Sequence, residues 1–340
     1  MSYEKKVVFI TGSSGFIGFH LASFFLSNDW RVIGLDALTD YYDINLKKAR
    51  QKLLCQNSNF HTYEGFVQDV KLLNEIFLNH KPNLVVHLAA QAGVRYSIEH
   101  PISYVESNLI GAFHILEIAR KYKPTHLLMA STSSVYGSNK DYPLHENQKC
   151  DTPISFYAAT KISNEAMAHS YSHLYEIPIT MFRFFTVYGP WGRPDMAPMI
   201  FANAIYAKKP IKIFNYGEMS RSFTYIDDIV VSIEKLIEKP TYLDNKFDRK
   251  SPNPATSWCP HRIFNIGNNK SIDLEIFIST LEKEIGITAL KEYTNMQKGD
   301  VKKTMADNTL LKDWVGEVKE TSLSNGIKEF ISWYKDFYNL

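Results

Sequence analysis

The chain has 340 residues, of which 45% are hydrophobic, and its formal net charge is +2 at pH 7. A chain of this length and composition can bury a large core, and we expect it to form two lobes. The small net charge, with both signs mixed, argues against binding to nucleic acid or to an anionic membrane surface. No apolar run of about 18 residues is present and the chain begins with a strand-like segment, so we expect a cytoplasmic protein without a membrane span.

The three cysteines give no sign of cross-linking or of metal binding. Cys55, Cys150 and Cys259 are odd in number and far apart, and none forms a Cys-x-x-Cys pair. Disulfide frameworks and zinc sites both depend on such spacings. The sequence therefore predicts neither, and we expect no metal.

The first regular segment leads into a glycine-rich turn. Residues 7–11 are apolar and predict a buried strand, Gly12-x-x-Gly15-x-x-Gly18 follows directly, and residues 16–26 have a helical pattern. Glycines at such a turn allow the backbone to approach a pyrophosphate closely, and the helix N-terminus then faces the anion with unpaired N–H groups. The spacing is a variant of the dinucleotide-binding fingerprint.

The next predicted strand, 31–36, ends in Asp36, which lies 18 residues after Gly18. A carboxylate at this position accepts hydrogen bonds from the adenosine ribose and repels a 2′-phosphate. The alternative is a glycine-rich turn with an acid nearby by chance. The complete order of strand, turn, helix, strand and acid favours a nucleotide site, and the sequence predicts NAD as the cofactor instead of NADP.

Strands and helices alternate up to about residue 185. Further strands are predicted at 60–63, 84–88, 126–130 and 179–184, and helices at 44–54, 72–79 and 103–122. Such alternation is typical of parallel strands joined by right-handed crossovers, so the fold class is α/β with a doubly wound (Rossmann) sheet.

The pattern changes after residue 186. A loop covers 188–194, a helix is predicted near 227–237 and a strand near 263–266, and the four prolines within 240–261 indicate a surface loop. We expect a Rossmann domain over 1–185, to which the chain returns near 221–240 and 261–268. A smaller mixed α/β lobe over 186–340 would bind the substrate.

Polar residues follow three of the predicted strands. Strand 84–88 is followed by a segment ending in Arg95, strand 126–130 by Ser131–Ser134, and strand 179–184 by Thr186 and a loop with Arg193. A hydroxyl run at a strand end is usually a helix cap or a turn. In open parallel sheets, however, ligands bind beyond the carboxyl ends of the strands. The convergence of three such ends favours a binding site.

Tyr157 and Lys161 are four residues apart at the start of a helical pattern over 157–174. Residues at this spacing share one helix face, and an ammonium beside a phenol favours the phenolate. Tyr136 and Tyr242 also have a lysine four residues on, but the intervening residues indicate turns. A surface tyrosine beside a solvated lysine is the alternative for the pair taken alone.

These motifs together resemble the extended short-chain dehydrogenase/reductase superfamily, and the resemblance covers essentially the whole chain. It rests on Gly12-x-x-Gly15-x-x-Gly18, Thr132 and Tyr157-x-x-x-Lys161. Segments 87–96 and 183–196 are similar to the UDP-glucuronate 4-epimerases, and Arg221-Ser-Phe-Thr-Tyr-Ile-Asp-Asp and Gly299-Asp300 resemble substrate-lobe motifs of that family.

The resemblance implies catalytic roles for Thr132, Tyr157 and Lys161, and a homodimer paired through the helices near 103–122 and 157–174. It also implies the following cofactor contacts: Gly12, Gly15, Phe16, Ile17, Gly18, Asp36, Asp69, Val70, Leu88, Ala89, Ala90, Asn108, Ser131, Tyr157 and Lys161. The expected contacts to a UDP-sugar are Arg95, Ser133, Ser134, Thr186, Arg193, Arg221 and Asp300.

The implied reaction is epimerisation at C4 of the sugar. Tyr157 takes the O4 proton as hydride leaves C4, Lys161 lowers the pKa of the tyrosine, and the 4-keto sugar turns over before the hydride returns to its other face. Related decarboxylases carry a glutamate where this chain has Ser134, and related 4,6-dehydratases carry an Asp-Glu pair at Ser133-Ser134. The serines favour epimerisation, with Arg193 and Thr186 clamping the substrate carboxylate.

Other functions stay open at this point. One is a 4-epimerase of a neutral or N-acetylated UDP-hexose, and a less favoured one is a UDP-glucuronate decarboxylase. A non-enzymatic NAD-binding regulator on the same fold is a further alternative. The joint presence of Thr132, Tyr157 and Lys161 argues against the regulator.

Overall fold

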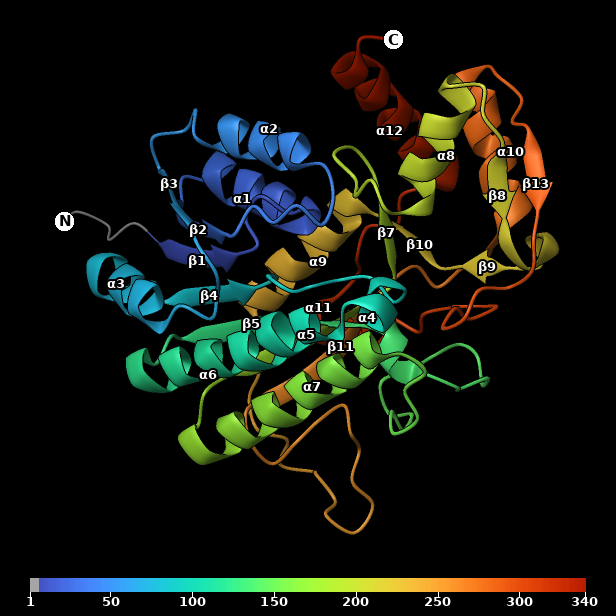
Figure 1. The fold of residues 1–340 in the computed structure, drawn as a ribbon. Helices are drawn as coiled ribbons and strands as arrows, with labels where there is room; N and C mark the ends of the chain where they lie inside the picture. Colours follow the sequence, from blue (N-terminus) through green and yellow to red (C-terminus); the bar gives the residue numbers. More distant parts are fainter. Residues whose placement is uncertain (1–5) are drawn as a thin grey trace.

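Seven parallel strands form the central sheet of the computed structural model, which describes residues 6–340 (Figure 1). Across the sheet the strands are β3 (Phe60–Glu64), β2 (Arg31–Asp36), β1 (Val7–Thr11), β4 (Leu84–His87), β5 (His126–Thr132), β6 (Ile179–Phe184) and β11 (His261–Ile266). Both faces of the sheet are covered, and the six residues of β6 are accordingly all buried. The prediction of a doubly wound parallel sheet is confirmed.

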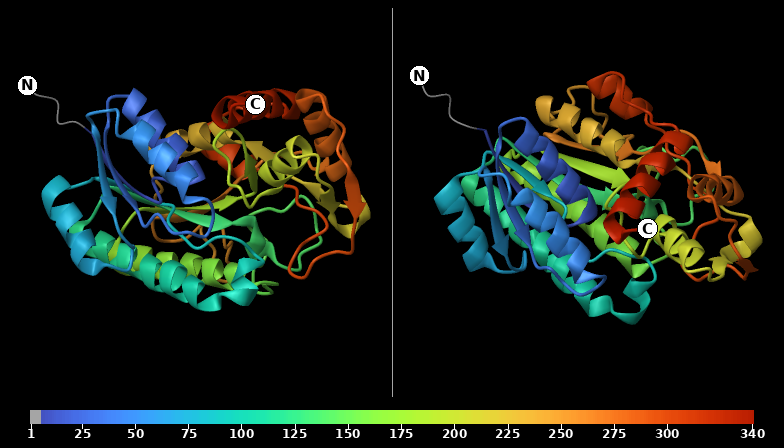
Figure 2. Two further views of the ribbon diagram at one scale, coloured as in Figure 1. Left: turned by 45° about the horizontal axis from the view of Figure 1, so that its top comes forward. Right: turned by 90° about the horizontal axis from the view of Figure 1, so that it is seen from above.

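Two layers of helices cover the sheet (Figures 1 and 2). One face packs against α3 (Val70–His80), α6 (Gly111–Tyr122) and α7 (Phe156–Tyr175). The other packs against α1 (Phe16–Ser27), α2 (Ile44–Leu54), α9 (Ile226–Glu238) and α11 (Thr309–Val315). In α9 the buried Ile226, Ile229, Val230 and Ile233 recur at helical spacing, so a single apolar stripe faces the sheet.

Short helical segments connect the strand ends to these layers. They are α4 (Tyr96–Glu99), α5 (Pro101–Tyr104), the π-helical η1 (Val105–Ile110) and the 3₁₀-helical η2 (Ser133–Tyr136). The helical pattern predicted over 103–122 is found, but it begins at Pro101 and includes a π-helical turn before α6, which was not predicted. Segment 240–261 contains no helix or strand before β11, as expected of a loop.

The remaining elements lie together at the carboxyl end of the sheet, on the right of Figure 1. They are β7 (Thr186–Tyr188), α8 (Ala197–Tyr206), β8 (Ile211–Ile213), η3 (Phe214–Gly217), β9 (Ser220–Arg221), β10 (Phe223–Tyr225), β12 (Ile272–Asp273), α10 (Leu274–Ile285), β13 (Lys291–Tyr293) and α12 (Leu323–Tyr338). The short strands pair as β7 with β10, β8 with β13, and β9 with β12. Most of these elements were not predicted.

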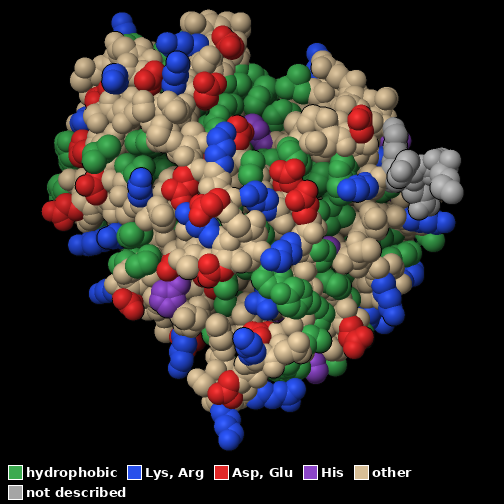
Figure 3. Space-filling model, turned by 180° about the vertical axis from the view of Figure 1, so that it is seen from behind, with side chains coloured by type: hydrophobic (Ala, Val, Ile, Leu, Met, Phe, Trp, Pro, Cys, Tyr) green, Lys and Arg blue, Asp and Glu red, His purple; other side chains and the backbone are tan. Residues whose placement is uncertain are grey.

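The surface carries no field of a single charge sign on the face seen in Figure 3, where basic and acidic side chains are interspersed. Among residues 6–340, none of the helices has the length and apolar character that crossing a bilayer requires.

Candidate active site

A cavity of about 390 Å³ lies at the carboxyl ends of β1, β4, β5 and β6. It is bordered by the glycine turn, by the segments that follow these strands and by the start of α7. It brings together many of the predicted site residues, namely Gly12, Gly15, Phe16, Ile17, Gly18, Asp36, Leu88, Ala89, Ala90, Ser131, Thr132, Ser133, Ser134, Tyr157, Lys161, Thr186 and Arg193.

The glycine turn is packed so closely that a side chain at Gly12 or Gly18 would collide with neighbouring backbone atoms. Gly12 has φ +74°, and a Cβ built on it would lie 2.9 Å from the backbone nitrogen of Ala89. A Cβ on Gly18 would lie 2.0 Å from the carbonyl oxygen of Gly12, so the helix packs directly on the turn. The buried hydroxyls of Ser13 and Ser14 have no hydrogen-bond partner. Glycine is thus required at Gly12 and Gly18, and with Gly15 these positions put bare backbone along the cavity, where a pyrophosphate could approach it closely.

Asp36 ends β2 beside this turn and is held by two backbone groups. Its Oδ2 accepts from the Ser14 nitrogen at 3.0 Å and its Oδ1 from the Leu38 nitrogen at 2.9 Å. An ionised carboxylate has about four acceptor sites, so each oxygen can accept a further bond. The orientation of the carboxylate is fixed while its capacity to bind a ribose diol remains.

Two cations of α2 border the same region and were not predicted. Lys47 lines the cavity and donates to the Thr39 carbonyl at 2.6 Å. Arg50 is fully buried and donates to the carbonyls of Ser14 and Trp191, at 3.0 and 2.6 Å. Arg50 thereby ties the glycine turn to the loop before Arg193. Lys47 and Arg50 are three residues apart on the helix predicted over 44–54, and this spacing is the only sequence signal for them.

Tyr157 and Lys161 occupy the same cavity from α7. Burial raises the pKa of Tyr157, while the charge of Arg193 and a hydrogen bond with Thr132 act to lower it. Burial lowers the pKa of Lys161 to about 8, and the charge of Glu165 opposes this shift. The Lys161 ammonium donates to the Ala130 carbonyl at 2.9 Å. Arg193 and Thr132 thus favour the phenolate, an effect the sequence analysis assigned to Lys161 alone.

The serines after Thr132 lie in the same corner of the cavity. The Thr132 hydroxyl donates to Ser134 Oγ at 3.3 Å and accepts from the Ser134 nitrogen at 3.2 Å. Among the described residues that line the cavity, Asp36 is the only one with a carboxylate. Apart from Asp36 at the end of β2, the described lining thus offers no acidic side chain that could act together with Tyr157.

Arg193 is held by a partner that the sequence analysis missed. Its guanidinium forms a bidentate pair with Asp195, with Nε 3.0 Å from Oδ1 and Nη2 also bonded to Oδ2. The Tyr41 hydroxyl donates to the same Oδ2 at 2.9 Å. The Arg-x-Asp spacing hints at this pair, whereas Tyr41 is remote in sequence.

A second cationic cluster lies next to the cavity. Arg95 forms an ion pair with Asp300 at 3.0 Å, and its guanidinium lies 5.0 Å from the centre of the Phe214 ring. Arg221 donates to the carbonyls of Ser220 and Lys302, and the nearby Asp300 opposes the lowering of its pKa by burial. A Cβ on Gly299 would lie 3.0 Å from Val94, which lines the cavity, so the cluster adjoins it.

Like Arg95, Arg221 and Asp300, three of the predicted cofactor contacts lie outside the cavity lining. The exposed Asp69 caps α3, where its Oδ1 accepts from the nitrogens of Lys71 and Leu72 at 3.0 Å, and Val70 follows it. Asn108 in the π-helical turn is buried and bonds to the backbone of Gln91 and to Thr160. Asn108 therefore holds the loop after β4 against α7.

The comparison with known families gives a clear result. The sequence model of the NAD dependent epimerase/dehydratase family matches residues 8–267. Protein CapI of Staphylococcus aureus is 44% identical over 97% of this chain and 99% of its own length. A probable UDP-glucuronate 4-epimerase of Rhizobium meliloti is 44% identical over 97% of both chains. A UDP-glucuronate 4-epimerase of Arabidopsis thaliana is 41% identical over 98% of this chain and 76% of its own.

Solved structures give the same result. The UDP-glucuronic acid 4-epimerase of Bacillus cereus, in complex with UDP-glucuronic acid and NAD, superposes with a TM-score of 0.87 at 31% identity, over 98% of this chain and 100% of that one. The UDP-glucose 4-epimerase of Thermotoga maritima with UDP-glucose has a TM-score of 0.84 at 29% identity, over 98% and 99%. The chain therefore belongs to the NAD dependent epimerase/dehydratase family, in the branch of the UDP-glucuronate 4-epimerases.

Proposed function

We propose that the protein is an NAD-dependent 4-epimerase that interconverts UDP-glucuronate and UDP-galacturonate through a transient 4-keto sugar. The observation that carries the proposal is the content of one cavity. It combines Tyr157 and Thr132 with the guanidinium of Arg193, and Asp36 is the only carboxylate among its described lining residues. A site of this kind can oxidise a sugar alcohol and bind an acidic sugar, but it lacks an acid to carry out further chemistry at C5.

NAD fits the glycine turn and the end of β2. The turn would hold the pyrophosphate, Asp36 the adenosine ribose, and Lys161 the nicotinamide ribose. When bound, NAD supplies a hydride acceptor at C4 of the sugar and returns the same hydride later. Its positively charged ring would add to the effect of Arg193 and Thr132 in favouring the phenolate of Tyr157.

The protein's own groups then perform the proton transfers. Tyr157 accepts the O4 proton as C4 is oxidised, and it gives that proton back after the sugar has turned. Thr132 bonds to the tyrosine and holds the reacting oxygen. The Lys161 ammonium, which donates to the Ala130 carbonyl, adds a positive charge to the cavity in which the phenolate of Tyr157 would form.

Substrate binding divides between two sets of cations. Arg95 and Arg221, next to Asp300, offer charge for the diphosphate of the UDP-sugar. Arg193 offers a planar fork for the sugar carboxylate, together with Thr186 and Ser133-Ser134. Asp195 fixes the guanidinium of Arg193 before substrate arrives, which lowers the entropic cost of binding.

The proposal is tested with a panel of UDP-sugars. We expect UDP-glucuronate to be converted to UDP-galacturonate, while UDP-glucose and UDP-N-acetylglucosamine react far more slowly. Turnover of the neutral or N-acetylated sugars with UDP-glucuronate untouched would establish the alternative epimerase. Release of CO2 with a UDP-pentose as the main product would establish a decarboxylase instead. Tyr157→Phe serves as the inactive control for each sugar.

We propose further that two copies pair through the helices near 101–122 and α7. Support comes from large apolar side chains that are exposed on these helices, at Ile102 (65%), Ile110 (41%), Phe113 (42%), Phe156 (39%), Leu174 (62%) and Tyr175 (39%). We expect Phe113→Lys to shift the mass in light scattering from dimer to monomer. The control Leu290→Lys, at a side chain 57% exposed in the other lobe, should leave the mass unchanged.

We place this activity in the cytoplasm. Cys55, Cys150 and Cys259 are all free thiols, and Cys55 is exposed. Free exposed thiols are typical of reducing compartments. Cell fractionation with an antibody to the protein tests this placement, and recovery from an extracellular fraction would contradict it.

A further inference from the structure

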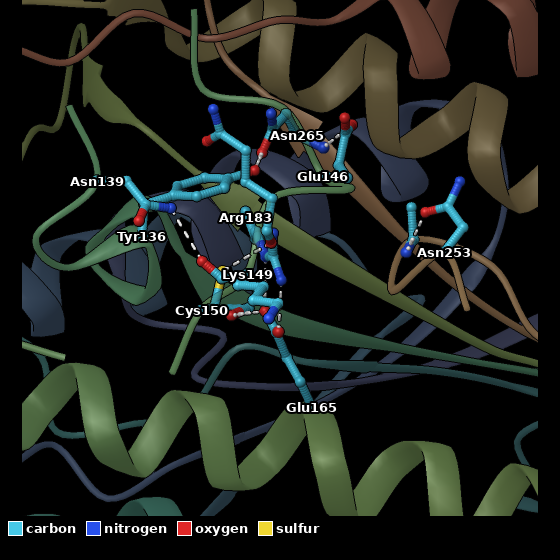
Figure 4. A network of polar contacts seen from close by, with 12 residues as sticks. Tyr136, Asn139, Glu146, Lys149, Cys150, Glu165, Arg183, Asn253 and Asn265 are labelled. Atoms are coloured by element: carbon cyan, nitrogen blue, oxygen red, sulfur yellow. Dashed lines mark hydrogen bonds and ion pairs between the residues drawn. The ribbon is translucent and has the colours of Figure 1, made fainter. Parts of the chain in front are cut away.

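A buried polar network lies directly behind the catalytic helix, between α7 and the sheet (Figure 4). Glu165 of α7 and Arg183 of β6 form its centre, and both residues are buried. Arg183 donates twice to the carboxylate, from Nε to Oε1 at 2.9 Å and from Nη2 to Oε2 at 2.8 Å. The Ser131 hydroxyl donates to the same Oε1 at 2.6 Å. The carboxylate therefore joins α7 to two adjacent strands of the sheet.

The network continues the contacts that hold the reactive groups. Three consecutive residues of β5 act on successive turns of α7: the Ala130 carbonyl accepts from Lys161, the Ser131 hydroxyl donates to Glu165, and Thr132 acts to lower the pKa of Tyr157. The three partners on α7 are spaced by four residues and so share one helix face. The bond between Ser131 and Glu165 fixes the strand immediately before Thr132. Its loss would free the end of β5 on which Thr132 lies.

The charges around Lys161 make Glu165 its counter-charge. Glu165 bonds to the buried Arg183 and lies one helical turn after the buried Lys161 on α7, and its charge acts to raise the pKa of Lys161 against the effect of burial. The cavity on the other side of Lys161 contributes only Asp36 as a carboxylate from its described lining. An ammonium buried without a counter-charge loses its proton readily.

We propose that Glu165 is a positioning residue of the reaction, which keeps Lys161 as an ammonium and holds Ser131, and with it Thr132, in register with Tyr157. This inference rests on the proposed function, because it assigns Glu165 a role in the work of those residues. Glu165 does not line the cavity, so it acts only through them.

Other titratable groups around these two residues stay neutral. Burial, together with the charge of Lys161, lowers the pKa of His87 on β4 to about 3. Cys150 and Tyr136 lie against Arg183, and burial raises the pKa of both groups, so they too stay neutral. Among the described residues that act on Lys161, Glu165 is thus the one that supplies an opposite charge.

Two further groups face Arg183 from the far side. Burial raises the pKa of Glu146 to about 7, and its carboxylate accepts from the Asn265 nitrogen at 2.7 Å. Burial lowers the pKa of His261 to about 3. Glu146 belongs to the same network but bonds to Asn265 of β11 and not to a residue of α7, so Glu146→Gln provides a matched control (Figure 4).

The test is Glu165→Gln in the NAD-loaded enzyme, with the titration of Lys161 followed directly by NMR of ¹³C-labelled lysine and assigned with Lys161→Arg. Removing this opposite charge should move the titration midpoint of Lys161 down from its wild-type position by about one to three pH units. The alkaline limb of the pH–rate profile should move down with it. Glu146→Gln should leave both unchanged.

An unchanged Lys161 titration and alkaline limb in Glu165→Gln, with only a lower melting temperature, would overturn the proposal and leave the carboxylate a purely structural role. If the single variant does not fold, Glu165→Gln with Arg183→Gln removes the unpaired guanidinium, and because the loss of this second cation acts to raise the pKa of Lys161, a smaller shift in the same downward direction is expected. Since the NMR midpoint does not depend on which UDP-sugar turns over, failure of this inference is separable from failure of the proposed function.

Discussion

Replacing Gly18 by alanine should separate cofactor binding from stability. A Cβ at Gly18 would lie 2.0 Å from the Gly12 carbonyl oxygen, whereas real Cβ atoms almost never come closer than 3.0 Å, so the turn must move by at least 3.0 − 2.0 = 1.0 Å. Alanine favours the helix by about 1 kcal/mol, and overpacking typically costs about 1–3 kcal/mol. The net loss of stability is therefore about 0–2 kcal/mol. A displacement of this size in a site can cost about 10²-fold in function, so NAD binding should suffer far more than folding.

The assay is the amount of nicotinamide nucleotide released per chain on denaturation, with NAD titrated into stripped protein by calorimetry. Gly286→Ala is the control, because Gly286 has φ +81° but no atom within 4 Å of a built Cβ. Its backbone strain should cost about 1–2 kcal/mol and leave NAD binding intact. Wild-type NAD content in Gly18→Ala, or an equal loss in Gly286→Ala, would refute the reasoning.

Four further outcomes are expected. Tyr157→Phe should keep the fold, seen by circular dichroism, and lose about 10²-fold or more in kcat; near-full activity would exclude it as the base. Asp36→Ala should bind NAD and NADP with similar Kd by calorimetry, and a retained preference for NAD would contradict its assignment. Arg193→Ala should slow epimerisation by about tenfold or more and raise the share of substrate lost as CO2; an unchanged rate and product ratio would remove the carboxylate clamp. The melting temperature should fall as the pH drops below about 6.5. Burial lowers the pKa values of four imidazoles to about 4 or about 3, so below this pH the unfolded chain binds more protons than the folded one. The raised pKa values of Glu146, Asp227, Asp228 and Glu234 act in the opposite direction, and the lowered pKa values of His80 and His169 act in the same direction as the four imidazoles. A melting temperature that rises towards acid would contradict the expectation. The four imidazoles are His20, His87, His126 and His261.

The Rossmann part of the fold was predictable because its signals are local. Strands buried on both faces form continuous apolar runs, and β2 and β6 have the bounds predicted for them, 31–36 and 179–184. The π-helical turn at 105–110 was not predictable in this way. It depends on Asn108, whose side chain bonds to Gln91 and Thr160, and these residues come from other parts of the chain.

A C-terminal lobe was expected over 186–340, but most of its helices and strands were not predicted, for two different reasons. Strands of two or three residues, such as β9 and β12, are too short to show any periodicity. The helix α10 has a regular apolar pattern at Leu274, Phe277, Ile278 and Leu281, so its sequence did contain the signal. A helix over 274–285 was therefore predictable from the sequence.

The candidate site likewise contains residues that could be predicted from the sequence and residues that could not. The residues in motifs, such as Tyr157 and Asp36, were identified because their chemistry follows from type and spacing. The residues that hold them were not, since Tyr41 reaches Asp195 across 154 positions and Ser131 reaches Glu165 across 34. Supporting contacts of this kind arise only when the chain has folded.

The most direct test of the central claim uses UDP-glucuronate that carries deuterium at C4 of the sugar. The purified enzyme is incubated with this substrate and no added cofactor, and proton and deuterium NMR spectra follow the products. The account predicts UDP-galacturonate with the deuterium still at C4, no label in water, no build-up of reduced nicotinamide and almost no CO2. Loss of the label to solvent, or a UDP-pentose as the main product, would contradict it.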